Sequence, residues 1–265
     1  MQERTITSLF EPLIAPELPA PPGLAYSDGI ACYLIMVAFR GNAEALQKRM
    51  PRGWKVSDDW GPGPAGMALK GANAFLSFHD TLLESKKAQS KSDPQGRFAI
   101  MAMVGRNDST GERCGMSFTG FSADPENVPG KYKDRVLVKS IARRLSLTGD
   151  ASNTEVSEGF DIDAGDGLVH FALDYRRPMP IWQYSPAAAP GAITFRAAKD
   201  ADILRYYWED ALTYVVISRP LNVDCSSKFE FDVTVPLVSD VMRDAEIIAV
   251  IIRPYYSRRV FNRDS

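Results

Sequence analysis

The chain has 265 residues, of which 45% are hydrophobic and 24% are charged, and its formal net charge is −2. This composition is typical of a globular protein. The charge disfavours nucleic acid as a partner, because proteins that bind it usually carry a basic surface. The short basic runs Lys86-Lys87 and Arg258-Arg259 are expected to be solvated.

Neither a membrane span nor a secretory signal is expected. No apolar run approaches the ~20 residues of a spanning helix, and residues 1–20 are acidic and rich in proline, without an apolar signal core. The three cysteines, Cys32, Cys114 and Cys225, lie far apart and in no CxxC spacing, which favours free thiols in a reducing cytoplasm. There are only two histidines, so a metal site rich in histidine is not expected, although carboxylates could still hold a metal. Our prediction is that the protein uses neither a metal nor a cofactor.

The first part of the chain combines a proline-rich arm, long strands and one helix. Residues 1–28 are expected to form an extended arm because of their prolines. Residues 29–40 are a continuous apolar run of strand length, and Asn42 caps a short helix that Pro51 stops. Strands are expected within residues 67–83. The polar, lysine-rich residues 84–96 that follow predict a mobile surface loop.

The rest of the chain reads as strands joined by short turns. Residues 97–104 and 113–121 flank one hairpin turn, and residues 154–162 and 167–175 flank another. Further strands are expected at residues 193–196, 213–218, 228–235 and 245–252. Residues 202–210 suit a helix by length and a strand by aromatic content. The many strands predict a mainly β (α+β) fold with few short helices, an antiparallel, barrel-like sheet in one domain over residues 29–265.

Residues 131–148 combine a strand pattern with positive charge. Alternate residues from Leu137 to Leu147 share one face, which carries Lys139 and Arg143 among apolar side chains. Two interpretations are open. The strand can lie at a sheet edge with its charges in water, or it can line a pocket in which the cations meet anionic partners.

No motif for nucleotide binding, zinc proteolysis or serine hydrolysis is present, so single residues carry the candidate chemistry. The candidate catalytic residues are Lys139, His79 and His170. A lysine beside apolar or cationic groups has a lowered pKa and can form a Schiff base with a ketone. Otherwise Lys139 is a surface lysine, and acid–base chemistry falls to the histidines, each of which can equally be a hydrogen-bonded structural residue. The candidate substrate-binding residues are Arg143, Arg97, Asp80 and Tyr175.

Three segments resemble the acetoacetate decarboxylase superfamily. The segment LIMVAFRGNAEALQKRMPRGWKVSD, residues 34–58, resembles that family's opening strand, helix and exit. The segments FLSFHDTL and RFAIMAMVG resemble two neighbouring strands. The third similarity is ARRLSLTGD followed by GDGLVHFALDYRRPMP, which resembles the catalytic strand and the strand after it. The similarity extends over residues 29–220.

The resemblance implies a barrel-like sheet around an apolar cavity and a lysine Schiff base with a second lysine adjacent to it. Arg143-Arg144 occupies the place of that lysine pair, and because arginine stays protonated, only Lys139 could replace the nucleophile. The family also implies a cofactor-independent enzyme that acts beside a carbonyl of a ketonic or carboxylated small molecule, as a decarboxylase-like lyase, an isomerase or a hydratase. The alternative is a non-catalytic binder or carrier of an anionic or polyketide-like molecule. The sequence is compatible with a homo-oligomer and does not determine the oligomeric state.

Overall fold

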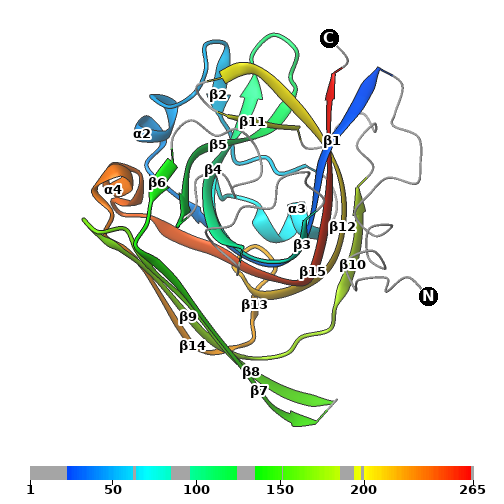
Figure 1. Cartoon of the computed structure of the whole chain (residues 1–265), viewed down its shortest axis with the longest axis vertical. Helices are drawn as coiled ribbons and strands as arrows, with labels where there is room; N and C mark the ends of the chain where they lie inside the picture. Colours follow the sequence, from blue (N-terminus) through cyan, green and yellow to red (C-terminus); the bar gives the residue numbers. More distant parts are fainter. Residues whose placement is uncertain are drawn as a thin grey trace, which may run out of the picture.

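The structure, a computed structural model, is mainly β with a few short helices (Figure 1), which confirms the predicted fold class. It describes residues 23–61, 64–84, 96–123, 135–150, 152–185, 194–197 and 200–263. Most of the expected arm, residues 1–22, and of the expected mobile loop, residues 85–95, lies outside the described residues. No helix of the described chain is long and apolar enough to cross a membrane.

The larger of two sheets has eleven strands. They are β1 (Leu24–Arg40), β2 (Trp54–Val56), β3 (Ala74–Glu84), β4 (Arg97–Asn107), β5 (Arg113–Ser122), β6 (Arg135–Leu137), β10 (Ile181–Ser185), β11 (Thr194–Ala197), β12 (Asp200–Ser218), β13 (Val223–Asp224) and β15 (Glu246–Arg263). The series β4-β3-β1-β15-β12-β11-β5 curves strongly, and β4 also pairs with β5 (Figure 1).

The larger sheet is mixed, which corrects in part the prediction of an antiparallel sheet. Most neighbours are antiparallel, but β5 pairs in parallel with both β6 and β11. Parallel neighbours require a connection that returns the chain along the sheet, and a pattern of short hairpin turns gives no sign of such returns. Residues 202–210 lie in β12, so their aromatic content was the better guide than their length.

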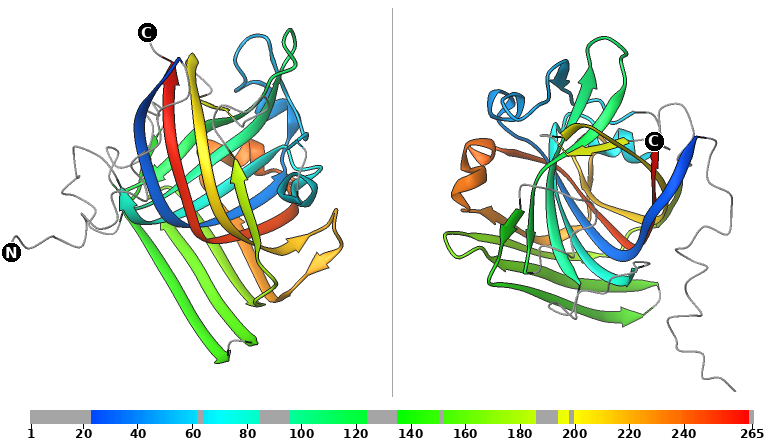
Figure 2. Two further views of the ribbon diagram at one scale, coloured as in Figure 1. Left: turned by 90° about the vertical axis from the view of Figure 1, so that its right-hand side faces the viewer. Right: turned by 45° about the horizontal axis from the view of Figure 1, so that its top comes forward.

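The second sheet has four antiparallel strands in the order β14-β9-β8-β7. They are β7 (Ser140–Asp150), β8 (Asn153–Asp163), β9 (Leu168–Arg176) and β14 (Ser226–Val233). This sheet lies against the outside of the curved sheet (Figure 2). Aromatic rings form part of the contact: the centroid of the Phe78 ring of β3 lies 5.1 Å from that of Phe160 of β8 and 5.4 Å from that of Phe171 of β9.

The single strand expected over residues 131–148 is instead two strands in different sheets. After β6 the chain changes sheet at Val138 and Lys139. The Val138 N–H donates to the Ser122 carbonyl of the larger sheet, and the Lys139 N–H donates to the Asp163 carbonyl of the second. Both backbone groups are thereby satisfied at the crossing, and β7 continues as an edge strand of the second sheet.

The first strand is buried on both faces, as its continuous apolar run predicted. Ile35 and Val37 belong to the apolar cluster between the sheets, whereas Leu34 and Met36 belong to a second cluster within the curve of the larger sheet. The strand begins at Leu24, five residues before the predicted start at Gly29. The expected capped helix is α2 (Ala43–Gln47), in which the Asn42 side chain accepts a hydrogen bond from the Ala45 N–H. The other helices are α3 (Pro64–Leu69), η2 (Pro236–Val238) and α4 (Ser239–Met242).

Candidate functional site

A cavity of about 230 Å³ lies within the curve of the larger sheet. Its walls come from β1, β3, β4, β5, β12 and β15, together with α3 and the loop before it. The apolar lining includes Leu34, Met36, Leu69, Phe75, Ile100 and Val104. The polar lining includes Ser77, His79, Glu209, Arg253, Tyr256 and Arg258. An apolar pocket with a few convergent polar groups is the usual form of a small-molecule site.

A β-bulge in β15 brings three of the polar side chains to the cavity. Between the pairs Leu34–Arg253 and Cys32–Tyr256, β1 advances two residues while β15 advances three. In a regular strand Arg253 and Tyr256 would face opposite sides, since side chains alternate. The extra residue at Pro254 restores both to the inner face, where Arg258 joins them.

His79 is held by a directed chain of hydrogen bonds. Its Nε2 lies 2.9 Å from Ser77 Oγ, which itself donates to the Ile100 carbonyl at 3.3 Å, and its Nδ1 lies 3.6 Å from Cys32 Sγ. Burial raises the pKa of the Cys32 thiol to about 12, so the thiol donates to Nδ1 and the imidazole proton is assigned to Nε2. Burial and the nearby Arg258 and Arg253 charges hold the pKa of His79 well below its ordinary value. His79 is therefore a neutral imidazole at neutral pH.

Glu209, Tyr256 and the two arginines form the charged part of the cavity. The Tyr256 hydroxyl donates to Glu209 Oε1. Glu209 of β12 lies directly opposite Arg258 of β15 in the strand register. The Arg253 guanidinium lies 5.3 Å from the centre of the Tyr256 ring. Burial and the Glu209 charge raise the pKa of Tyr256 far above its ordinary value, so its phenol stays a hydrogen-bond donor. Two buried guanidinium groups beside one carboxylate suit an anionic ligand.

The loop before α3 closes one side of the cavity. Trp60 Nε1 donates to the Ala72 carbonyl at 2.7 Å, and its ring packs 5.4 Å from the Phe75 ring. Two glycines permit this course. Gly61 has a φ of 85°, and a Cβ at Gly66 would lie 2.1 Å from the Gly61 carbonyl oxygen, so only glycine fits at Gly66.

Lys139 does not face the cavity, which contradicts the pocket interpretation for this residue and agrees with the alternative of an exposed charge. It precedes β7 at the crossing between the sheets, and its side chain is exposed. Among the described residues that line the cavity there is no lysine. The physical reason is the sheet change at Val138, which ends the alternation that had placed Lys139 and Arg143 on one face of a single strand.

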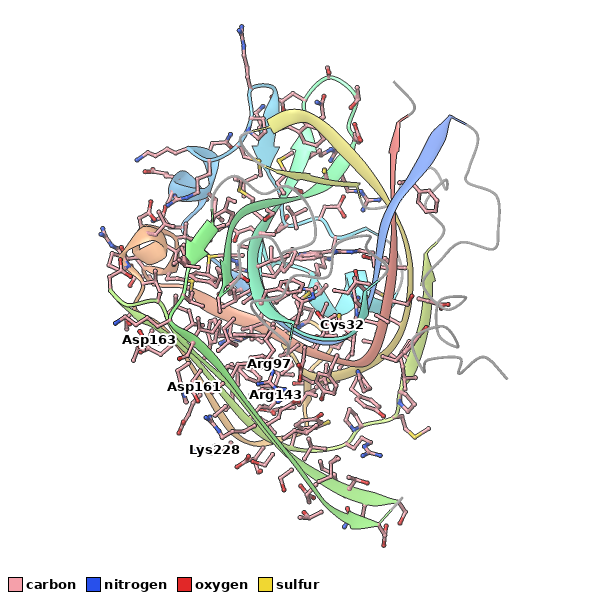
Figure 3. The ribbon with its side chains drawn as sticks, in the orientation of Figure 1. Cys32, Arg97, Arg143, Asp161, Asp163 and Lys228 are labelled. Atoms are coloured by element: carbon pink, nitrogen blue, oxygen red, sulfur yellow. The ribbon has the colours of Figure 1, made fainter. Side chains whose placement is uncertain are left out.

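Arg143 and Tyr175 meet in a buried cluster between the two sheets rather than at the cavity. Arg143 Nη2 donates to Glu158 at 2.7 Å, and the two side chains are 4% and 0% exposed. The Tyr33 hydroxyl of β1 donates to the same carboxylate at 2.9 Å. Burial and then the Glu158 charge raise the pKa values of Tyr33 and Tyr175. Arg143 thus lies at the second sheet, whereas Cys32 lies within the curve of the larger sheet (Figure 3).

The other predicted site residues also lie outside the cavity, with the exception of His79. His170 is half-buried on the second sheet, with Nδ1 2.6 Å from Asp161 and Nε2 3.3 Å from Glu230. Asp80 and Arg97 form a cross-strand ion pair at 3.1 Å. Asp80 follows His79 directly in β3, so its side chain points to the opposite face of the strand.

Sequence reasoning missed Glu209, Arg253, Tyr256 and Arg258. The expected solvated run Arg258-Arg259 was wrong for Arg258, which is 4% exposed. One signal was present in the sequence. The segment IIRPYYSRR, residues 251–259, continues a strand that is predicted to be buried on both faces, so its arginines are expected to lie among apolar side chains. The alternation of inward and outward side chains is broken at Pro254, because the bulge there shifts it by one residue.

The chain matches no family model, and no curated protein matches it. Among solved structures, the chain is similar to acetoacetate decarboxylase-like proteins. An acetoacetate decarboxylase-like enzyme from Sphingomonas wittichii RW1 is 13% identical, with 93% of this chain and 94% of that chain covered and a TM-score of 0.46. Acetoacetate decarboxylase from Legionella pneumophila is 10% identical, with 93% and 92% covered and a TM-score of 0.48.

A third similar structure is the enduracididine biosynthesis enzyme MppR, complexed with the condensation product of pyruvate and imidazole 4-carboxaldehyde. It is 12% identical, with 93% of this chain and 89% of that chain covered and a TM-score of 0.45.

Proposed function

We propose that this protein is an enzyme that acts beside the carbonyl of a small carboxylated substrate, as a lyase, isomerase or hydratase. In this proposal the curved sheet is a barrel-like enclosure around the substrate. One observation carries the proposal: Arg253, Arg258, Glu209 and neutral His79 line a single, largely apolar cavity. Buried cations that can hold an anion and a carboxylate that can accept a proton are the parts required for enolisation.

The arginines hold the substrate carboxylate in this proposal. Each guanidinium has five N–H donors, enough to serve both its neighbours in the protein and a ligand. Their charges also stabilise the negative oxygen that forms when a carbonyl compound becomes an enolate. Both effects are strengthened by burial, since Arg253 and Arg258 are 9% and 4% exposed.

Glu209 is the proposed base. It removes a proton from the carbon beside the carbonyl, the electrons of that C–H bond move into the new C=C bond, and the carbonyl oxygen becomes the enolate oxygen. The Tyr256 hydroxyl fixes the orientation of the carboxylate through its hydrogen bond. His79 contributes as a neutral imidazole, which orients Ser77 toward the cavity.

Hydrogen–deuterium exchange tests this proposal without knowledge of the full reaction. Pyruvate, 2-oxohexanoate and acetoacetate would each be incubated with the protein in D₂O, and NMR would follow exchange beside the carbonyl. We expect faster exchange with the wild type for at least one of these acids, and a loss of about 10²–10⁴-fold in Glu209→Gln. Arg106→Gln, which changes an exposed arginine outside the cavity, should exchange like the wild type. Equal exchange by Glu209→Gln and the wild type would overturn the proposed base.

The alternative is a non-catalytic binder of an anionic small molecule, and one observation favours it. Both ring nitrogens of His79 already have partners within the protein, as in a histidine with a structural role. The two functions differ in one outcome. A binder retains affinity for the acids and shows no exchange in any of them.

A further inference from the structure

The polar and apolar linings of the cavity are segregated along the strands. Cross-strand pairing defines rows across the curved sheet. Ile30 pairs with Arg258, which pairs with Glu209, and Leu34 pairs with both Arg253 and His79. These rows hold the charged groups, together with Tyr256 in the row between them.

The next rows are mainly apolar. Met36 pairs with Ser77, which pairs with Ile100, and the row beyond contains Phe75. Val104 lies four residues further along β4 than Ile100. At ~3.3 Å per residue, the distance along β4 from the row of His79 to Val104 is roughly 20 Å. The cavity is therefore elongated, with a charged end and an apolar end.

The apolar end has two aromatic side chains in its wall, Trp60 and Phe75. Trp60 and Phe75 pack against each other with ring planes at 55°, and the indole N–H is already bonded to the Ala72 carbonyl. The charged groups nearest this end, Asp59 and Arg113, pair with each other at 3.1 Å. This end thus offers a ligand an aromatic and aliphatic surface more than a polar one.

We propose that the ligand is an oxo acid with an apolar tail about the size of a phenyl ring. This inference rests on the proposed function for the oxo group and adds the class of substrate. The carboxylate binds at Arg253 and Arg258, and the tail lies among Phe75, Ile100 and Trp60. A cavity of about 150 Å³ with apolar walls holds benzene, so one of about 230 Å³ accommodates a ring together with a short carboxylated segment.

Calorimetric titration of a graded series tests the tail. The probes are pyruvate, 2-oxobutanoate, 2-oxohexanoate and phenylpyruvate, with 2-oxohexanedioate as the form whose tail ends in a second carboxylate. We expect affinity to rise roughly fourfold for each buried methylene, with phenylpyruvate bound most tightly. Affinity that stays constant or falls as the tail grows would contradict the inference. If 2-oxohexanedioate bound most tightly, the inference would also be contradicted, and the result would indicate a dicarboxylate site that uses Arg113.

Variants locate the tail. Ile100→Phe should fill the apolar end, weakening phenylpyruvate at least tenfold while leaving pyruvate within about twofold. Leu69→Phe changes another apolar lining residue, which belongs to α3, and repeats the test should Ile100→Phe unfold in a thermal melt. Leu145→Phe changes an exposed leucine of β7 and serves as the matched control. Unchanged phenylpyruvate affinity in both cavity variants would overturn the proposed location.

One further probe separates this inference from the proposed function. 3-Phenylpropanoate has the carboxylate and the ring but no carbonyl. Its tighter binding relative to acetate supports the apolar-tail site even where no acid undergoes exchange, in which case only the catalytic proposal fails. If pyruvate undergoes exchange but affinity shows no preference for an apolar tail, the proposed function is supported and only the apolar-tail inference fails.

Discussion

Neighbouring arginines in β7 have very different surroundings. The Arg143 side chain is buried against Glu158, with Tyr33 and Phe160 rings 4.8 and 4.9 Å from its guanidinium carbon. Arg144, by contrast, pairs with Asp161 at the surface and its side chain is 54% exposed. Burial raises the pKa of Glu158, so the Arg143 charge is what makes an ionised carboxylate tolerable there.

Arg143→Leu should therefore destabilise the protein by about 3–5 kcal/mol, because it leaves Glu158 buried and unpaired. Urea unfolding measures the loss. Arg144→Leu is the matched control and should cost less than about 1 kcal/mol, as expected for an exposed pair. Glu158→Gln added to Arg143→Leu should restore part of the stability. Equal losses for the two single variants would show that burial does not set the difference.

The two histidines respond to pH in opposite directions. Hydrogen bonding to Asp161, aided by Glu230, raises the pKa of His170 in the folded protein. The contribution of His170 to stability is therefore complete below the pKa of about 6.5 that it has in the unfolded chain. This contribution is lost as the pH rises through its pKa in the folded protein. For His79 the pKa is lowered, so its contribution is complete above about 6.5 and is lost as the pH falls.

Unfolding free energies measured from pH 5 to pH 9 test the His170 contribution. The difference between the wild type and His170→Gln should be largest at pH 5 and should shrink toward pH 9. A difference that grows with pH would contradict the raised pKa. His170 is half-buried, so moderate salt should weaken the effect.

The cysteines differ in accessibility. All three are free, as predicted, with Cys32 and Cys114 buried and Cys225 partly exposed. Burial raises the pKa of Cys32 to about 12, so little thiolate forms near neutral pH. A disulfide-exchange reagent at pH 8 should modify one thiol quickly in the native protein and three in urea, and Cys225→Ser should abolish the fast reaction. Rapid native modification of Cys32 would contradict its burial.

At the scale of elements, alternation predicted strands well wherever it was unbroken. The pattern failed at two irregular points, the sheet change at Val138 and the bulge at Pro254. The bulge shifts the side chains that follow it by one position, which exchanges the inner and outer faces. The sheet change ends the alternation, because the residues that follow it belong to a different sheet. The candidate site depended on both points: the first removed Lys139 from the cavity, and the second placed Tyr256 and Arg258 within it.

The edge strand β7 carries exposed apolar side chains. Leu145 and Leu147 are 47% and 54% exposed, and an exposed apolar edge promotes association between chains. We expect Leu147→Lys to change the free energy of unfolding by less than about 0.5 kcal/mol and to slow aggregation on mild heating, as light scattering would report. A large loss of stability would mean that Leu147 packs against the rest of the molecule.

At the scale of the whole molecule, the mainly β class followed from strand length and turn residues, which are local properties. The division into two sheets did not, because it depends on pairings between strands far apart in the chain, such as β1 with β15. The same holds for the site: Glu209 and Arg258 become neighbours only through the pairing of β12 with β15. Their spacing in the sequence carries no sign of that contact.

A crystal structure with 4-bromophenylpyruvate tests the central claim most directly, because anomalous scattering from bromine locates the tail independently of the rest of the ligand. We expect bromine in the cavity beside Phe75, Ile100 and Trp60, with the carboxylate hydrogen-bonded to Arg253 or Arg258. A ligand bound instead at the second sheet, beside Arg144 or Lys139, would contradict the assignment of the cavity as the functional site.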